Sequence, residues 1–149
     1  MKLMYTLLPL LLMTACGSKP AVATAPELLE PEKGQVWQLV RMQGRPLDRG
    51  RRSPTLLFNP ETGTVTGTAH CNEYTFHYRT SHPQSGAEGD TYELQLTFWG
   101  SGSTECPEGE MSAERRYLGL LGKATSMSLT STTLTLYQKN REVLHYELL

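Results

Sequence analysis

The sequence predicts an α+β domain in which a strongly twisted antiparallel sheet curls towards a partial barrel and is covered by one helix. Two observations predict this fold class. Apolar and polar side chains alternate over most of the chain after Gln35, as they do along strands with one buried face. A single segment, residues 110–123, instead has its apolar side chains at helical spacing. A run of strands with one separate helix is typical of α+β domains.

The expected strands follow one another along the domain. The first covers residues 36–40 and places Trp37 and Leu39 on one face. Residues 59–63 have the Pro and Gly of a turn, and residues 81–89 form a polar loop. The other strands are marked by these segments or alternating side chains: Leu56 and Phe58; residues 64–68; Tyr74, Phe76 and Tyr78; Tyr92, Leu94, Leu96 and Phe98; Met127 and Leu129; Leu134 and Leu136; Leu144, Tyr146 and Leu148.

The predicted helix is amphipathic. Met111, Leu118 and Leu121 share one face, with Tyr117 and Leu120 beside it. Acidic residues precede its first turn and a lysine closes its last turn, which is the order of charge that the helix dipole favours. We therefore expect this face to cover the sheet.

The composition limits the classes of protein to which the chain can belong. The 149 residues include 14 Lys and Arg against 15 Asp and Glu, a formal net charge of −1. A nucleic-acid-binding protein that relies on bulk positive charge is therefore not expected. With 38% hydrophobic residues, the chain is too apolar for general disorder and too polar for a protein with several membrane spans. Its length suits one domain with a short appendage.

The N-terminus has the pattern of a bacterial secretion signal. Lys2 precedes an apolar stretch, residues 3–13, which is too short to cross a bilayer as a helix. The next residues complete Met-Thr-Ala-Cys, which resembles a lipobox, so Cys16 is expected to be acylated and to become the new N-terminus. Two acyl chains suffice for stable anchoring. The alternative is an ordinary secretory signal that is cleaved near Ala15.

The chain divides into a signal peptide (residues 1–15), a lipidated cysteine with a tether (16–34) and a folded domain (35–149). Pro20, Pro26 and Pro31 disfavour helix and sheet in the tether. Gly17-Ser18 lacks the aspartate that commonly retains bacterial lipoproteins at the inner membrane. We therefore expect a lipid-anchored protein at the periplasmic face of the outer membrane.

The domain also carries an ordered set of short motifs. In chain order they are Trp37-x-Leu39, Val65-x-Gly67, Cys71-Asn72-x-Tyr74, Cys106 and Leu134-x-Leu136. This set resembles the META (heat-shock-protein HslJ-like) domain of bacterial envelope lipoproteins. The resemblance implies an α+β fold, residence in the cell envelope and association with stress or antibiotic tolerance, without an established enzymatic activity. The chain departs from the family at His70, where glycine is frequent, and in the segment before Cys106.

Cys71 and Cys106 are the two cysteines that remain beside the expected anchor. An even pair of cysteines in an oxidising compartment is expected to form a disulfide. The alternative is a redox-active or metal-binding pair, but the two do not have Cys-x-x-Cys spacing. A structural disulfide is therefore the prediction.

No catalytic residue, metal site or cofactor is expected. The sequence lacks a nucleophile elbow, a phosphate-binding glycine loop and a His-Glu-x-x-His motif. His70, His77 and His82 do not have the spacing of a metal site. Acidic residues gather at the helix start, where the helix dipole accounts for them without catalysis: Glu105, Glu108, Glu110 and Glu114.

Two features are candidate contacts for a partner. One is a set of arginines, which would suit lipid headgroups, lipopolysaccharide phosphate or an acidic protein, although a solvated loop also accounts for them: Arg41, Arg45, Arg49, Arg51 and Arg52. The other is Trp99, which opens a Gly-Ser-rich stretch and is either a contact residue or a cap on the core. A curled sheet with aromatic faces would hold a lipid chain, or be filled by its own side chains.

Together these observations predict a non-enzymatic, envelope-anchored lipoprotein. Its domain would be a binding or structural module that supports envelope integrity or stress tolerance, with an envelope protein or a lipid as ligand and no nucleic acid. The alternatives are a chaperone or assembly pilot for an outer-membrane complex, and an envelope hydrolase or redox enzyme.

Overall fold

The computed structural model describes residues 32, 34–48, 52–81, 83–86 and 89–149. The expected signal peptide and most of the tether lie outside these residues. The elements in chain order are β1 (Val36–Met42), β2 (Arg45–Pro46), β3 (Thr55–Asn59), β4 (Thr64–Ala69), β5 (Asn72–Thr80), β6 (Gln84–Gly86), β7 (Gly89–Ser101), α1 (Glu108–Leu121), β8 (Ser126–Leu129), β9 (Thr133–Gln138) and β10 (Arg141–Leu148).

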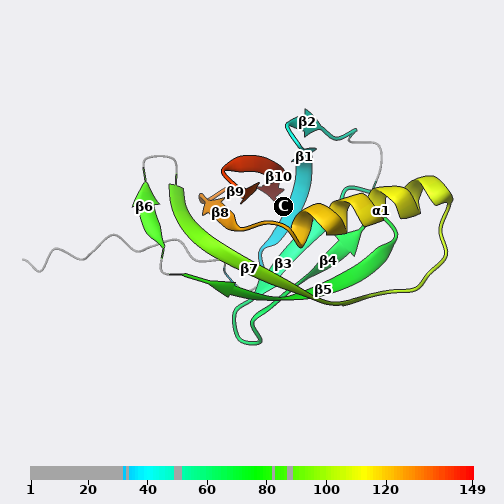
Figure 1. Ribbon diagram of the computed structural model, residues 1–149, viewed down its shortest axis with the longest axis horizontal. Helices are drawn as coiled ribbons and strands as arrows, with labels where there is room; N and C mark the ends of the chain where they lie inside the picture. The colour runs from blue at the N-terminus through cyan, green and yellow to red at the C-terminus, as the bar shows by residue number, and fades with distance from the viewer. Residues whose placement is uncertain (1–31, 33, 49–51, 82, 87–88) are drawn as a thin grey trace, which may run out of the picture.

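The sheet closes on itself (Figure 1). Its strands run in the order β10-β9-β8-β7-β5-β4-β3-β1, and β1 also pairs with β10, so that eight antiparallel strands form a barrel. The closing pair matches Trp37 with Leu148 and Leu39 with Tyr146. The sequence predicted a partial barrel, and this is corrected to a closed one. Closure pairs the two strands that would otherwise be sheet edges.

Buried side chains fill the barrel interior. Alternate residues of each strand point inward, as in the pairs Trp37 and Leu39 on β1 and Leu134 and Leu136 on β9, all at most 1% exposed. Aromatic side chains from neighbouring strands pack edge to face, as Tyr74 does with Phe76. The interior positions that were considered for a lipid chain are therefore occupied by the protein's own core.

The helix packs against the barrel with a face that differs from the predicted one. α1 contacts β4 and β10, and its buried residues are Glu114, Tyr117 and Leu121. Met111 and Leu118, expected to lead the buried face, are only partly buried. Polar side chains can take the central positions because each finds a buried hydrogen-bonding partner on the barrel.

The strands lie where alternation predicted them, with three differences. β2 is an additional short strand, and β6 lies within the polar segment that was expected to be a loop. β7 continues to Ser101 and contains a bulge. Phe98, expected on the buried face of β7, is 53% exposed, although its ring contacts that of Phe76 with centroids 5.2 Å apart.

Candidate functional site

A disulfide ties the β4–β5 turn to the segment before α1. Cys71 and Cys106 are bonded, with Cα atoms 6.4 Å apart, inside the usual range for a disulfide. The bond links residues that are separated by 35 positions in the sequence. The structure therefore places the two cysteines as the disulfide prediction requires.

Asn72 reinforces the same connection. Its backbone N–H donates to Glu114 Oε2 at 2.8 Å, and its side-chain amide donates to Glu114 Oε1 at 3.1 Å. The Asn72 amide also donates to the Thr104 carbonyl and accepts from the Thr104 N–H, at 3.2 and 2.9 Å. Asn72 and Glu114 are both nearly fully buried. The carboxylate of Glu114 thus positions α1 and the segment that leads to it.

Three tyrosine hydroxyls form a buried chain between the helix and the barrel. Tyr117 Oη lies 2.8 Å from Tyr74 Oη and 3.0 Å from Tyr146 Oη. Tyr74 Oη in turn donates to the Thr55 carbonyl at 2.8 Å. Burial first, and the neighbouring phenols second, raise the pKa of all three hydroxyls well above the usual value, so that each stays protonated as a donor.

Gly67 makes room for this chain. A Cβ atom at position 67 would lie 1.9 Å from the Thr55 carbonyl oxygen and 2.9 Å from Tyr74 Oη. A side chain there would displace the hydrogen bond between these two groups. The short motifs that include Gly67, Cys71, Asn72 and Tyr74 are therefore engaged in holding the helix on the barrel.

The exposed aromatic of the domain stands at a bulge in β7. Thr75 of β5 pairs with Gly100, and the next residue, Phe76, pairs with Phe98, so Trp99 is the extra residue. Bulges of this kind redirect a side chain out of the regular pleat. Trp99 is 73% exposed, and its ring meets the ring of His77 edge to face, with centroids 4.8 Å apart. Trp99 is therefore a surface residue and not a cap on the core.

An open groove lies beside Trp99 on the outer face of the barrel. Its volume is about 690 Å³, within the range of ligand sites. We call it the Trp99 groove, and it is lined by Val36, Thr55, Leu57, Thr66, Gly67, Thr68, Glu73, Tyr74, Thr75, Trp99, Gly100, Ser101 and Gly102. A row of paired residues crosses it from β1 to β7: Val36, Leu57, Thr66, Thr75 and Gly100.

The polar groups of the Trp99 groove divide into two sets. Thr55 and Thr68 are bonded to each other, with hydroxyl oxygens 3.0 Å apart. The hydroxyls of Thr66, Thr75 and Ser101 and the Glu73 carboxylate make no hydrogen bond or ion pair within the described part of the chain. The second set is available to a ligand. Sequence reasoning missed these residues, although the Thr-x-Thr alternation of β4 indicates an outward hydroxyl row.

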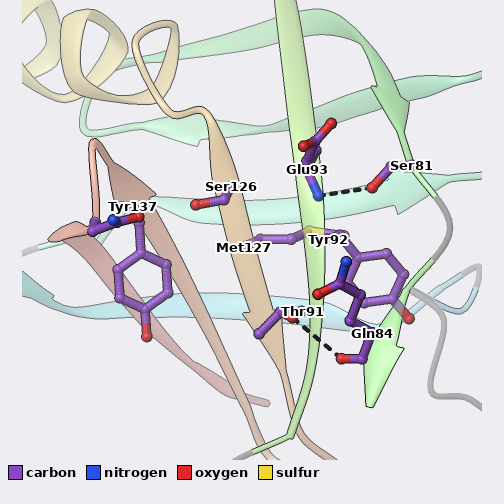
Figure 2. Close-up of a pocket in the computed structure, with 9 residues that line it drawn as sticks. Ser81, Gln84, Thr91, Tyr92, Glu93, Ser126, Met127 and Tyr137 are labelled. Carbon is purple, nitrogen blue, oxygen red and sulfur yellow. Dashed lines mark hydrogen bonds between the residues drawn. The ribbon is translucent and has the colours of Figure 1, made fainter. Parts of the chain in front are cut away.

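A second recess lies where β6, β7 and β8 meet (Figure 2). Its volume is about 600 Å³, and Tyr92 and Met127 contribute to its lining from the barrel interior. Two of its polar residues are engaged in holding its walls: Thr91 Oγ1 donates to the Gln84 carbonyl at 3.2 Å, and Ser81 Oγ accepts from the Glu93 N–H at 3.0 Å. Its polar atoms therefore serve the local fold more than those of the Trp99 groove.

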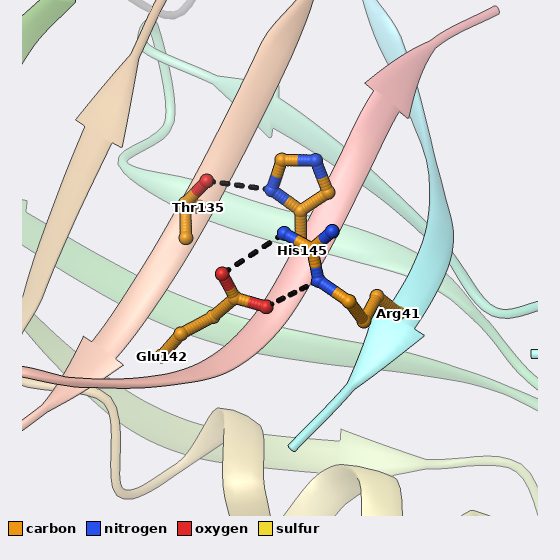
Figure 3. Close-up of polar contacts among 4 residues, drawn as sticks. All are labelled: Arg41, Thr135, Glu142 and His145. Carbon is orange, nitrogen blue, oxygen red and sulfur yellow. Dashed lines mark hydrogen bonds and ion pairs between the residues drawn. The ribbon is translucent and has the colours of Figure 1, made fainter. Parts of the chain in front are cut away.

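A polar cluster on β1, β9 and β10 contains the first of the candidate arginines (Figure 3). Arg41 donates to both carboxylate oxygens of Glu142, at 2.6 and 3.0 Å. These hydrogen bonds hold the pKa of Glu142 below its usual value. His145 Nδ1 lies 2.7 Å from Thr135 Oγ1, and burial, followed by the charge of Arg41, lowers the His145 pKa. Arg41 is therefore occupied by an internal partner.

The other predicted residues are not brought together. Arg45 on β2 and Arg52 are exposed, while Arg49, Arg51, His82 and Cys16 lie outside the described residues. Within the described ranges, histidine, cysteine and acidic side chains do not form a group of three or more that could hold a metal ion. No helix in the described part of the chain combines the length and the apolar character needed to cross a membrane.

The comparisons with known proteins agree with this geometry. No curated protein shows significant sequence similarity to the chain. A protein from Burkholderia xenovorans, solved by NMR, has a similar fold with a TM-score of 0.57 and 18% identity, over 89% of this chain and 97% of that one. A second NMR structure is 20% identical with a TM-score of 0.49, over 81% and 96%. The family model of the META domain matches residues 29–148, and the chain belongs to the META-domain family.

Proposed function

We propose that the protein is a non-enzymatic lipoprotein, anchored through Cys16 at the periplasmic face of the outer membrane, whose META domain binds an envelope component. Such binding would support envelope integrity or tolerance of stress and antibiotics. One observation carries the proposal. Trp99 stands 73% exposed at a strand bulge, beside a groove with hydroxyl groups that no internal partner uses. Large aromatic side chains held rigidly at a surface are favoured anchors in binding sites.

The buried polar groups support a binding module over an enzyme. The Glu114 carboxylate accepts hydrogen bonds from Asn72, and the Glu108 carboxylate pairs with Arg115 at 2.8 Å. The three buried tyrosines bond to one another. These groups are spent on holding the helix and its approach, and a general acid or base would instead have to reach a substrate.

The anchor half of the proposal is tested by cell fractionation. Wild-type protein is expected in the outer-membrane fraction with a metabolically incorporated acyl label. Cys16→Ala removes the thiol that would be acylated, so the variant should lose the label and leave the membranes. A Cys16→Ala variant that keeps the label would refute the anchor.

The binding half is tested by crosslinking in living cells. A photo-reactive amino acid at position 99 is expected to give a discrete adduct, since this side chain faces the groove from outside the pleat. The matched control places the same group at Arg141, which is also exposed on a strand of the barrel. Equal adducts at both positions, or none at 99, would contradict a site at Trp99. An outer-membrane assembly protein as the adduct would favour a pilot function.

A further inference from the structure

We propose that the Trp99 groove binds an uncharged oligosaccharide chain, an inference that rests on the domain being a binding module. The ligand class follows from what the groove offers. One flat aromatic face, a row of hydroxyl groups and a single carboxylate lie along one surface. The outer strands of other small barrels, the OB-folds, bind oligosaccharides, which shows that this kind of surface suffices for such ligands.

The aromatic side chain supplies the apolar part of such a site. Sugar rings present C–H groups on their faces, and these pack on an aromatic plane, where both surfaces lose water. Trp99 keeps most of its surface in solvent, while the ring of His77 meets it edge to face at 4.8 Å. The bulge fixes the backbone at this point. The indole is thus presented in one orientation before a ligand arrives.

The hydroxyl row supplies the polar part. Thr66 and Thr75 face each other on β4 and β5, with the Glu73 carboxylate next to Thr75 along the strand and Ser101 across from it on β7. Hydroxyl groups donate and accept, and a carboxylate only accepts, so the set complements sugar hydroxyls, which do both. Because these groups are free of partners among the described residues, binding does not cost internal hydrogen bonds.

Charge argues for a neutral ligand over an anionic surface. Glu73 is the charged residue in the lining of the groove, and it is negative. Arg45 pairs with Met42 at the far end of β1 from Val36, the residue of that strand that lines the groove. A phosphate-bearing lipid surface would meet the Glu73 carboxylate without a compensating cation from the groove itself, and such surfaces attract basic segments.

The length of the groove suits a chain and not a single sugar. The row from Val36 to Gly100 crosses five adjacent strands. Four strand spacings amount to about 19 Å along the surface, which accommodates several linked sugar units. The groove is open, so a polymer can enter from the side without a free end.

Tryptophan fluorescence gives a direct test, because the two tryptophans differ completely in exposure. Trp37 is 1% exposed and Trp99 is 73% exposed, so a change on titration reports on Trp99. The full chain, in a detergent without a sugar headgroup, is titrated with three neutral probes: chitohexaose, cellohexaose and maltohexaose. At least one probe is expected to give a saturable blue shift. The absence of a shift with all three at millimolar concentration would overturn the proposal.

Variants locate the site. Trp99→Ala should weaken binding, followed by calorimetry, by about tenfold or more, as expected for a hot-spot aromatic. Thr66→Val keeps the shape of the side chain but removes its hydroxyl, and should weaken binding by about two- to tenfold. Phe98→Ala is the matched control, since Phe98 is also exposed but does not line the groove. Equal losses in Trp99→Ala and Phe98→Ala would overturn the assignment to the groove.

Two further arms separate this proposal from the others. Vesicles of phosphatidylethanolamine and phosphatidylglycerol that bind the protein through Trp99, while the sugars do not, would identify a lipid surface and reject the saccharide. A crosslink at position 99 to an envelope protein, without sugar binding, would also reject the saccharide and leave the binding module standing. Sugar binding in a protein that Cys16→Ala does not release from membranes would reject the anchor and keep the groove.

Discussion

The hydroxyl of Tyr117 lies 2.8 Å from that of Tyr74, although the two residues are 43 positions apart in the chain. The contact joins the helix to the barrel wall through two buried phenols. Tyr117 also reaches Tyr146 at 3.0 Å, so one side chain satisfies partners on β5 and β10. The helix is therefore attached to the barrel by polar contacts as well as apolar ones.

We expect Tyr117→Phe to lower the free energy of unfolding by about 1–3 kcal/mol, the cost of leaving a buried polar group unsatisfied. The ring and its packing remain, so the loss reports on the hydroxyl. Denaturant titration measures it. Tyr137→Phe, at a partly exposed tyrosine, should change stability by less than about 0.5 kcal/mol. Equal effects of the two substitutions would mean that the hydroxyl chain contributes nothing.

The sequence predicted the strands well, because each is marked by its own local alternation. Closure of the barrel joins β1 to β10, the two ends of the domain, and no local pattern carries that information. The buried face of the helix was also missed, since Glu114 reads as a surface carboxylate until Asn72 is known to lie opposite it. Partners far apart in the chain decided both features.

The candidate site was predicted in part. Trp99 was identified as a contact residue or a core cap, and its exposure decides between them. The groove beside it needs the strand order β7-β5-β4-β3-β1, which brings Gly100 to Thr75 and Thr66 to Leu57. Only the order of neighbours turns outward residues of separate strands into one surface.

Exchange of the buried Asn72–Glu114 pair gives a second prediction. Asn72→Asp places a second carboxylate against that of Glu114 and removes the amide donor, so stability should fall by about 3 kcal/mol or more. Adding Glu114→Gln restores one donor and one charge, and the double variant should recover part of the loss. Double-mutant analysis of denaturant titrations measures the coupling. Additive losses would show that the two side chains do not interact.

Removal of the disulfide tests a structural role for the cysteine pair. The Cys71→Ala/Cys106→Ala variant should lose about 2–4 kcal/mol, because the unfolded chain regains the freedom of the closed loop. Cys16→Ala should leave stability unchanged. Reductant should bring the wild type to the stability of the double variant, as seen in its melting temperature. A wild type that melts identically with and without reductant would contradict the prediction.

The pair Arg41–Glu142 predicts a pH-dependent contribution to stability. Arg41 lowers the folded-state pKa of Glu142 below the usual 4.5, so the contribution is present above pH 4.5 and is lost as the pH falls through the folded-state pKa. The pair is partly exposed, so its size is about 0–1 kcal/mol. Glu142→Gln should be less stable than wild type at pH 7 and equally stable at pH 2. A difference that persists at pH 2 would assign the effect to packing.

The turn between β4 and β5 predicts an inversion of the usual ranking of alanine and glycine. His70 has a φ of +60° and is the first of two loop residues between the paired Ala69 and Asn72, where hairpins favour glycine. His70→Gly and His70→Ala both remove the imidazole, and only alanine retains the steric cost of about 1 kcal/mol at positive φ. The glycine variant should therefore unfold at a higher denaturant concentration. At Gln95, an exposed position on β7, alanine should instead be the more stable by about 0.5–1 kcal/mol. If alanine is also the more stable residue at position 70, the backbone there is not strained, and the departure from the glycine that is frequent in the family costs the fold nothing.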